Sequence, residues 1–110
     1  MALIKPISNV MSGTVTEITP TNVNTGNSFE FTLPNVVIGS KLVIVLMLHN
    51  ASSSPITSIT TSDGTIDVNL DIGNNATKTL IITPSAPSVT VTGSKPNTNV
   101  FDLLKCYMIA

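Results

Sequence analysis

Arginine is absent from this 110-residue chain, and only 10% of the residues are charged. Five lysines and six acidic residues are spread along the sequence without a run of either sign, so the net charge is −1. Proteins that bind nucleic acid or anionic membranes cluster lysine and arginine on one surface. We therefore expect neither nucleic acid nor membrane among the partners of this protein.

Histidine and cysteine occur once each, as His49 and Cys106. A zinc site needs three or four such ligands, so transition-metal chemistry is excluded. A nucleophilic triad would have to combine His49 with a serine such as those in Ser52–Ser54. A small hydrolase built on that pair is one alternative, but we favour a histidine at a solvent edge or in a cap. The prediction is no enzyme, no catalytic residue and no cofactor.

Tryptophan is also absent, and Tyr107 is the single tyrosine. Sugar-binding modules of this size usually stack a sugar ring on an exposed aromatic side chain. Phe29 and Phe31 are expected on an apolar face, so Tyr107 alone is placed on an outward face. A carbohydrate-binding or adhesin module is therefore the alternative function rather than the first choice.

Long hydrophobic segments are missing as well. The longest apolar run, Leu42–Leu48, is far shorter than the roughly 20 residues of a membrane helix. The start, Met1–Pro6, lacks the apolar core of a signal peptide, and the single Cys106 cannot form an intrachain disulfide. We expect a complete chain made in a cytoplasm, with Cys106 buried as a small hydrophobic side chain.

Serine, threonine and asparagine make up 39 of the 110 residues, and they separate short β-type runs at intervals of 8–12 positions. This spacing is typical of an all-β protein. The predicted fold is a single antiparallel β-sandwich domain over residues 1–110, with eight or nine strands in a jelly-roll or immunoglobulin-like topology. Weaker strands are expected at Leu3–Ile7 and Thr14–Thr19, and a polar loop at Pro20–Asn27.

The run Lys41–His49 is apolar at nearly every position, whereas most other runs alternate apolar and polar residues. A strand that is apolar on both faces must be covered on both. It is therefore either a central strand enclosed within this protein, or a strand covered on one side by the second sheet and on the other by a partner.

Asp63-Gly64 lies between the runs Ile56–Thr61 and Ile66–Ile72, and this dipeptide is a strong signal for a tight hairpin. With the following run Lys78–Thr83 it predicts a three-stranded meander. The positions expected to be buried follow from the period-2 pattern of each strand. They are Phe29, Phe31, Leu33, Leu42, Ile44, Leu46, Ile66, Val68, Leu70, Leu80, Ile82, Val89 and Val91.

Asp67, Asn69 and Asp71 alternate along one predicted strand, with Asp63 across the turn, and their oxygen atoms are candidate ligands of a calcium ion. The calcium-loop pattern fails, because Ile72 stands where glycine is required and Lys78 where glutamate is required. Alternate side chains on a strand are also about 6.6 Å apart, too far for adjacent ligands of one ion. We expect a solvated or partner-facing polar face and no metal.

The chain as a whole resembles small accessory proteins of tailed-phage particles, namely capsid cement or decoration proteins and β-sandwich modules of fibres. The resemblance rests on the start Met-Ala-Leu-Ile, on Thr/Ser-rich strands such as Ile56–Thr61, and on a single β domain without catalytic groups. It implies a homotrimer on a capsid lattice, without a cofactor. We thus expect a non-catalytic structural protein of the virion, made in the host cytoplasm, whose partners are itself and a phage coat or tail protein.

Overall fold

The computed structural model describes residues 13–26, 28–49, 56–72, 74–95 and 100–110, and within them every regular element is a β-strand. There are nine strands in this described part of the chain. They are β1 (Val15–Glu17), β2 (Thr21–Asn24), β3 (Phe29–Leu33), β4 (Lys41–Leu48), β5 (Ser58–Thr61), β6 (Gly64–Ile72), β7 (Asn74–Pro84), β8 (Val89–Ser94) and β9 (Phe101–Ile109). No helix that could span a membrane occurs among these residues.

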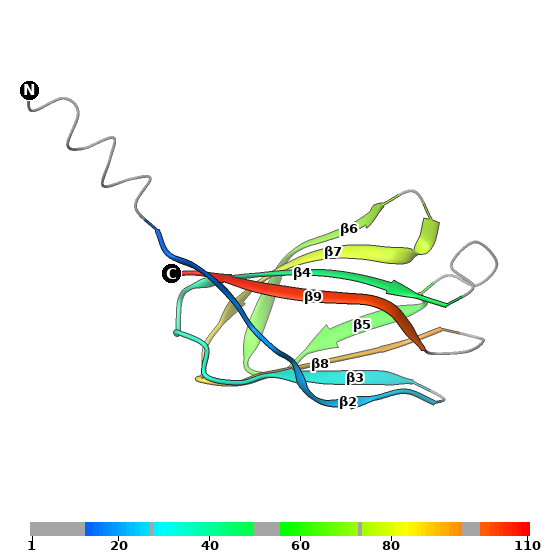
Figure 1. Cartoon of the computed structure of the whole chain (residues 1–110), viewed down its shortest axis with the longest axis horizontal. Helices are drawn as coiled ribbons and strands as arrows, with labels where there is room; N and C mark the ends of the chain where they lie inside the picture. The colour runs from blue at the N-terminus through cyan, green and yellow to red at the C-terminus, as the bar shows by residue number, and fades with distance from the viewer. Residues whose placement is uncertain (1–12, 27, 50–55, 73, 96–99) are drawn as a thin grey trace, which may run out of the picture.

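The strands form two antiparallel sheets that pack face to face as a β-sandwich (Figure 1). One sheet has the order β1-β9-β4-β7-β6, and the other has the order β2-β3-β8-β5. The pairs β1 with β9, β3 with β8 and β4 with β7 are nested along the chain, which is the pattern of a hairpin rolled upon itself. This pairing favours the jelly-roll topology over the immunoglobulin-like one. The predicted all-β sandwich is confirmed.

The core fills the space between the sheets and consists of the inward-facing positions of β3, β4, β7, β8 and β9. In β3 the buried positions alternate with half-buried ones, as the period-2 pattern predicts. The buried side chains are Phe29, Phe31, Leu33, Val36, Leu42, Ile44, Leu46, Leu48, Leu80, Ile82, Val89, Val91, Cys106 and Met108. Ten of the thirteen predicted core residues are thus confirmed.

The three exceptions, Ile66, Val68 and Leu70, all lie in β6. Ile66 is partly buried against the core, whereas the side chains of Val68 and Leu70 are 38% and 56% exposed. The strand register shifts between Ile66 and Val68, so that Ile66 pairs with Ile82 but Val68 pairs with Ile81. Such a bulge inserts one extra residue and moves the following side chains to the opposite face. The prediction that Val68 and Leu70 belong to the core is wrong for this reason.

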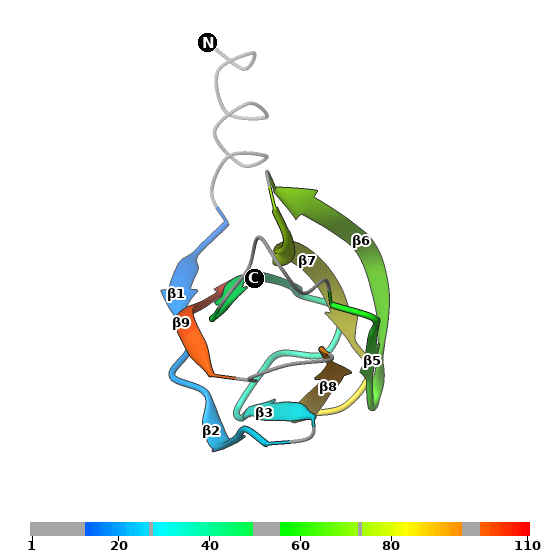
Figure 2. The same cartoon turned by 90° about the vertical axis from the view of Figure 1, so that its right-hand side faces the viewer.

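The predicted meander is correct for its second pairing, β6 with β7, and wrong for its first, because β5 pairs with β8 and not with β6. The link between β5 and β6 is a corner that passes from one sheet to the other (Figure 2). Asp63 has the positive φ of 50° that its dipeptide suggests. The hydrogen bond from the Ser62 amide to the Thr90 carbonyl oxygen ties this corner to the smaller sheet, at 2.8 Å.

A second local difference lies in the predicted loop Pro20–Asn27, which contains the short strand β2. Its partner is β3, and the pairing is irregular between Thr21 and Asn24. All four β2 residues are exposed, so no apolar alternation marks the strand in the sequence. The weak strand predicted at Leu3–Ile7 lies outside the described residues.

Candidate functional site

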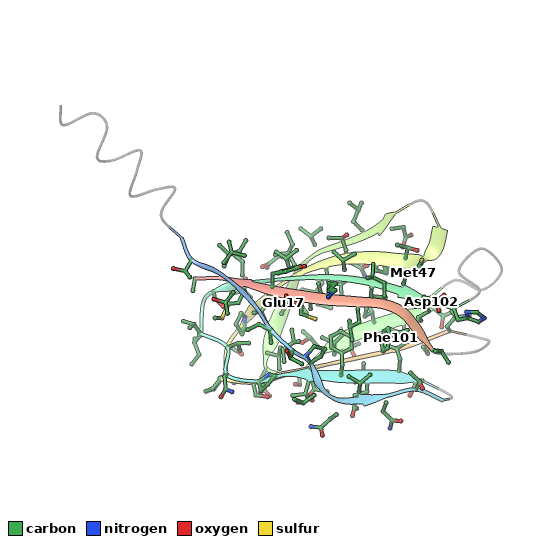
Figure 3. All side chains as sticks on the ribbon, viewed as in Figure 1. Glu17, Met47, Phe101 and Asp102 are labelled. Carbon is green, nitrogen blue, oxygen red and sulfur yellow. The ribbon has the colours of Figure 1, made fainter. Side chains whose placement is uncertain are left out.

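His49 lies at the exposed end of the sandwich, just after β4, and its imidazole contacts a carboxylate. Nδ1 is 3.3 Å from each of the two carboxylate oxygens of Asp102 (Figure 3). Asp102 belongs to β9, whose register against β4 shifts between Met47 and Leu48. Leu48 pairs with Phe101 and Met47 with Leu103, so Asp102 is the extra residue. The sequence contains no sign that Asp102 contacts His49, because the bulge depends on how β4 and β9 pair.

The His49–Asp102 pair can hold an imidazole in one orientation, as the acid does in a catalytic triad. Both side chains are well exposed, at 54% and 41% of their surface. The Ser52–Ser54 run that was considered as a source of the nucleophile lies outside the described residues. Within the described residues this pair is therefore an exposed polar contact on the surface.

The acidic residues of the considered calcium site do not converge. Asp67 contacts Lys41 and Thr83, whereas Asp71 pairs with Lys78 at 2.7 Å. The register shift in β6 separates the two aspartates, since Thr83 points away from the core and Lys78 is in phase with buried Leu80. The expectation that they share one strand face is therefore wrong. Within the described residues no group of three possible metal ligands is found.

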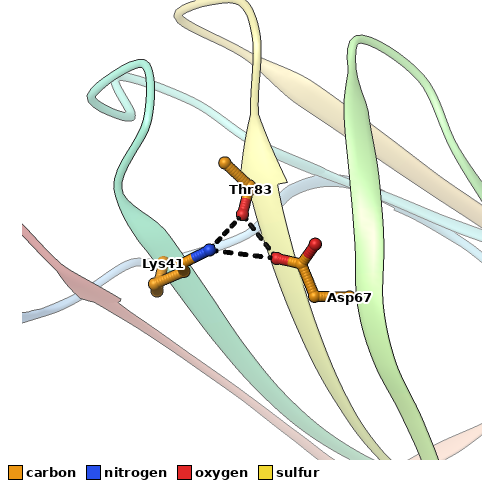
Figure 4. A network of polar contacts seen from close by, with 3 residues as sticks. All are labelled: Lys41, Asp67 and Thr83. Carbon is orange, nitrogen blue, oxygen red and sulfur yellow. Dashed lines mark hydrogen bonds and ion pairs between the residues drawn. The ribbon is translucent and has the colours of Figure 1, made fainter.

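Asp67 is the centre of a small polar network that spans three strands (Figure 4). The Lys41 Nζ atom lies 2.7 Å from Thr83 Oγ1 and 3.2 Å from Asp67 Oδ2, and the Thr83 hydroxyl donates to the same carboxylate oxygen. The Thr83 hydrogen bond, followed by that from Lys41, holds the pKa of Asp67 below its usual value of 3.8. The carboxylate is thus charged at neutral pH and neutralised by the lysine beside it.

Cys106 is buried as predicted, with 1% of its surface exposed. Burial, and to a smaller degree the charge of Glu17, raises the pKa of its thiol from 9.0 to about 12. A thiol that stays protonated is a poor nucleophile. The Cys106 side chain therefore acts as a small hydrophobic group of the core.

We expect a thiol reagent at pH 8 to leave folded Cys106 unmodified and to label it after unfolding in denaturant. The folded pKa lies above the unfolded value, so the native state keeps a proton that the unfolded chain loses. The contribution of Cys106 to the free energy of unfolding is therefore constant below pH 9 and decreases as the pH rises towards 12. Rapid labelling of the native protein at pH 8 would contradict the burial.

Lys95 is a buried lysine, at a position that no sequence pattern marks as buried. It follows β8 and continues the inward row of Val91 and Gly93, and only 3% of its surface is exposed. No hydrogen-bond partner for its Nζ atom lies within the described residues. A buried ammonium is costly without a partner. Residues 96–99, which follow it, are outside the description.

The larger sheet presents an apolar surface on the side turned away from the core, which we call the outer face. Its central strand β4 contributes Val43, Val45 and Met47, which alternate with the buried row beginning at Leu42. Figure 3 shows Met47 on this side of the sheet and Phe101 between the two sheets. Register pairs give the other apolar members, which are Val15, Val68, Leu70, Ile81, Leu103, Tyr107 and Ile109.

The outer face is continuous across the strands. One cross-strand row runs from Tyr107 through Val43 and Ile81 to Val68. The next row runs from Lys105 through Val45 and Thr79 to Leu70, so polar residues flank Val45 on both sides. In the row after it, Met47 lies beside Leu103. These side chains are half-buried or exposed, so the described residues cover them incompletely. Within this described part, the second sheet covers the Lys41–His49 run on one side, and no described element covers the other side.

The smaller sheet has an outward face of opposite chemistry. Its strands β3, β5 and β8 place mostly hydroxyl side chains outward, with Thr32 Oγ1 and Thr90 Oγ1 3.0 Å apart, and Ser58 Oγ and Ser94 Oγ 2.9 Å apart. We call this the hydroxyl face. Hydroxyl groups remain well solvated, so this surface needs no cover.

Comparison with protein-family models, curated proteins and solved structures found no significant match for this chain.

Proposed function

We propose that this protein is a non-catalytic structural component of a phage particle, a capsid cement or decoration protein or another virion accessory protein. The observation that carries the proposal is the two-sided surface of the sandwich. One sheet offers a broad apolar outer face, and the other offers a hydroxyl face. A protein whose role is to pack against copies of itself and a larger lattice needs an apolar surface of this kind.

The partners in this proposal are other copies of the chain and a coat or tail protein of the particle. The chain has few charges, and three of its five lysines are already paired within it: Lys41, Lys78 and Lys105 each contact an acidic side chain. Its contacts must then depend on apolar packing and backbone hydrogen bonds. Virion assembly in a host cytoplasm is compatible with a reduced, buried Cys106.

The direct test is to add purified protein to particles that lack it and to measure the bound fraction. We expect stoichiometric incorporation that persists from about 0.1 M to about 1 M salt, although the Debye length falls from roughly 10 Å to 3 Å over that range. Particles that already carry the protein are the control and should take up none. Absence of incorporation, or its loss at high salt, would contradict the proposal.

The hydroxyl face supports one alternative, a carbohydrate-binding or adhesin module. Sandwiches of jelly-roll type occur in lectins as well as in capsid proteins, so the fold is compatible with both. Glu30 and Thr92 form a cross-strand pair on β3 and β8, and such groups can bind sugar hydroxyls. Specific binding on a glycan array by protein that does not bind particles would favour this alternative.

A further inference from the structure

We propose that the outer face is the surface through which copies of this chain associate, packing against the same face of a second copy. The inference rests on the self-association within the proposed function and names the surface that performs it. It starts from the β4 strand, which occupies the middle of the five-stranded sheet. Its inward side chains are fully buried by the smaller sheet, whereas among the described residues no second layer covers Val43, Val45 and Met47.

Apolar side chains occur on all five strands of the sheet, with Lys105 and Thr79 between them in the Val45 row. From the central strand they continue to Leu103 and Ile109 on β9, at 37% and 42% exposure, and to Val68 and Leu70 on β6. Monomeric soluble proteins rarely expose a contiguous apolar surface of several hundred Å². The bulge in β6 adds to this surface, because it turns two side chains outward that regular pairing would have placed in the core.

The charges on the outer face favour an identical partner. Lys41 is paired with Asp67 at 3.2 Å, and Lys105 is paired with Glu17 at 3.5 Å. Both pairs are internal to one chain, so the face has no net charge from these four groups. Two such faces can meet without like-charge repulsion, whereas a nucleic acid or an anionic membrane would require excess positive charge.

The size of the face is sufficient for a specific contact. The four long strands β9, β4, β7 and β6 at about 4.8 Å spacing are about 19 Å wide, and eight residues of β4 extend about 26 Å, which gives roughly 500 Å². Two such faces bury about 1,000 Å² in total, which is the approximate area expected for a biological interface. Aligned packing of two sheet faces is a common arrangement in proteins.

In a face-to-face pair the middle strand of each sheet lies at the centre of the contact. Val45 lies in the middle of the outward row of β4, between Val43 and Met47. It would therefore face the second copy at the centre of the interface, where a new charge is costly to remove from water.

The test compares the solution mass of the full chain with that of Val45→Lys and Leu70→Lys, by sedimentation at tens of micromolar. We expect an oligomer for the wild-type protein and at least a tenfold weaker association for each variant. The Leu70 side chain is already 56% exposed in one chain, so lysine there is compatible with folding. Thr92→Lys is the matched control, because Thr92 is a half-buried, outward residue of an interior strand of the smaller sheet.

A wild-type monomer at this concentration would overturn the proposal and assign the outer face to a different partner. Dissociation by Thr92→Lys, with both outer-face variants still associated, would overturn it as well. A different result would contradict the proposed function alone: the wild-type oligomer forms, but it is not incorporated into particles. Circular dichroism of each variant verifies that the sandwich is folded.

Discussion

Replacing Phe31 with alanine is expected to lower the free energy of unfolding by about 3–5 kcal/mol. Phe31 is fully buried in β3, and its ring packs edge-on against that of Phe101 with centroids 5.8 Å apart. The substitution removes this contact and leaves a cavity between the two sheets. Since the free energy of unfolding of a domain of this size is only about 5–15 kcal/mol, the substitution is expected to remove a large part of it.

Urea unfolding at fixed protein concentration measures this effect, because association would otherwise contribute to the apparent stability. The matched control is Glu30→Ala, one position earlier in the same strand and on its outward side. It should change the free energy of unfolding by less than about 0.5 kcal/mol. Equal effects of the two substitutions would contradict the assignment of Phe31 to the inward side of β3 and of Glu30 to its outward side.

The sequence predicts β3, β4 and β8 closely, because alternation in these strands is produced by burial on one side. The burial pattern of β8, for example, alternates without interruption from Val89 to Ser94. Prediction fails for β6, where Ile66, Val68 and Leu70 also alternate. The bulge that redirects Val68 and Leu70 depends on how β6 pairs with β7, and the residues of β6 alone contain no sign of it.

Prediction of the candidate site has the same limits. The burial of Cys106 and the two-sided apolar character of β4 follow from local composition and are confirmed. The contact of His49 with Asp102 joins residues 53 positions apart through a second bulge, so it could not be read from spacing. The outer face as a surface also required the register of four strand pairs.

Gly93 occupies a position in β8 where any larger residue is expected to destabilise the protein. A Cβ atom built there would lie 2.6 Å from Cε2 of the Phe29 ring, closer still to Cζ, and 2.7 Å from the Ser58 carbonyl oxygen. The ring of Phe29 is held in place by edge-on contact with Phe101, with centroids 5.4 Å apart. Because neither the ring nor the Ser58 backbone can move freely, Gly93→Ala should cost about 1–3 kcal/mol of unfolding free energy.

A double-mutant cycle with Phe29→Leu separates the two contacts. The smaller side chain relieves the clash with the ring but not that with Ser58, so Gly93→Ala should cost less in the Phe29→Leu background, with a coupling of about 0.5–3 kcal/mol. Gly13→Ala is the control glycine substitution, since its Cβ would meet its nearest neighbour at an ordinary 3.5 Å. Urea unfolding of the four proteins of the cycle gives the coupling. A value near zero would show that the Phe29 ring does not confine Gly93, whereas the expected value would show that glycine is needed here for the two sheets to close over the aromatic cluster.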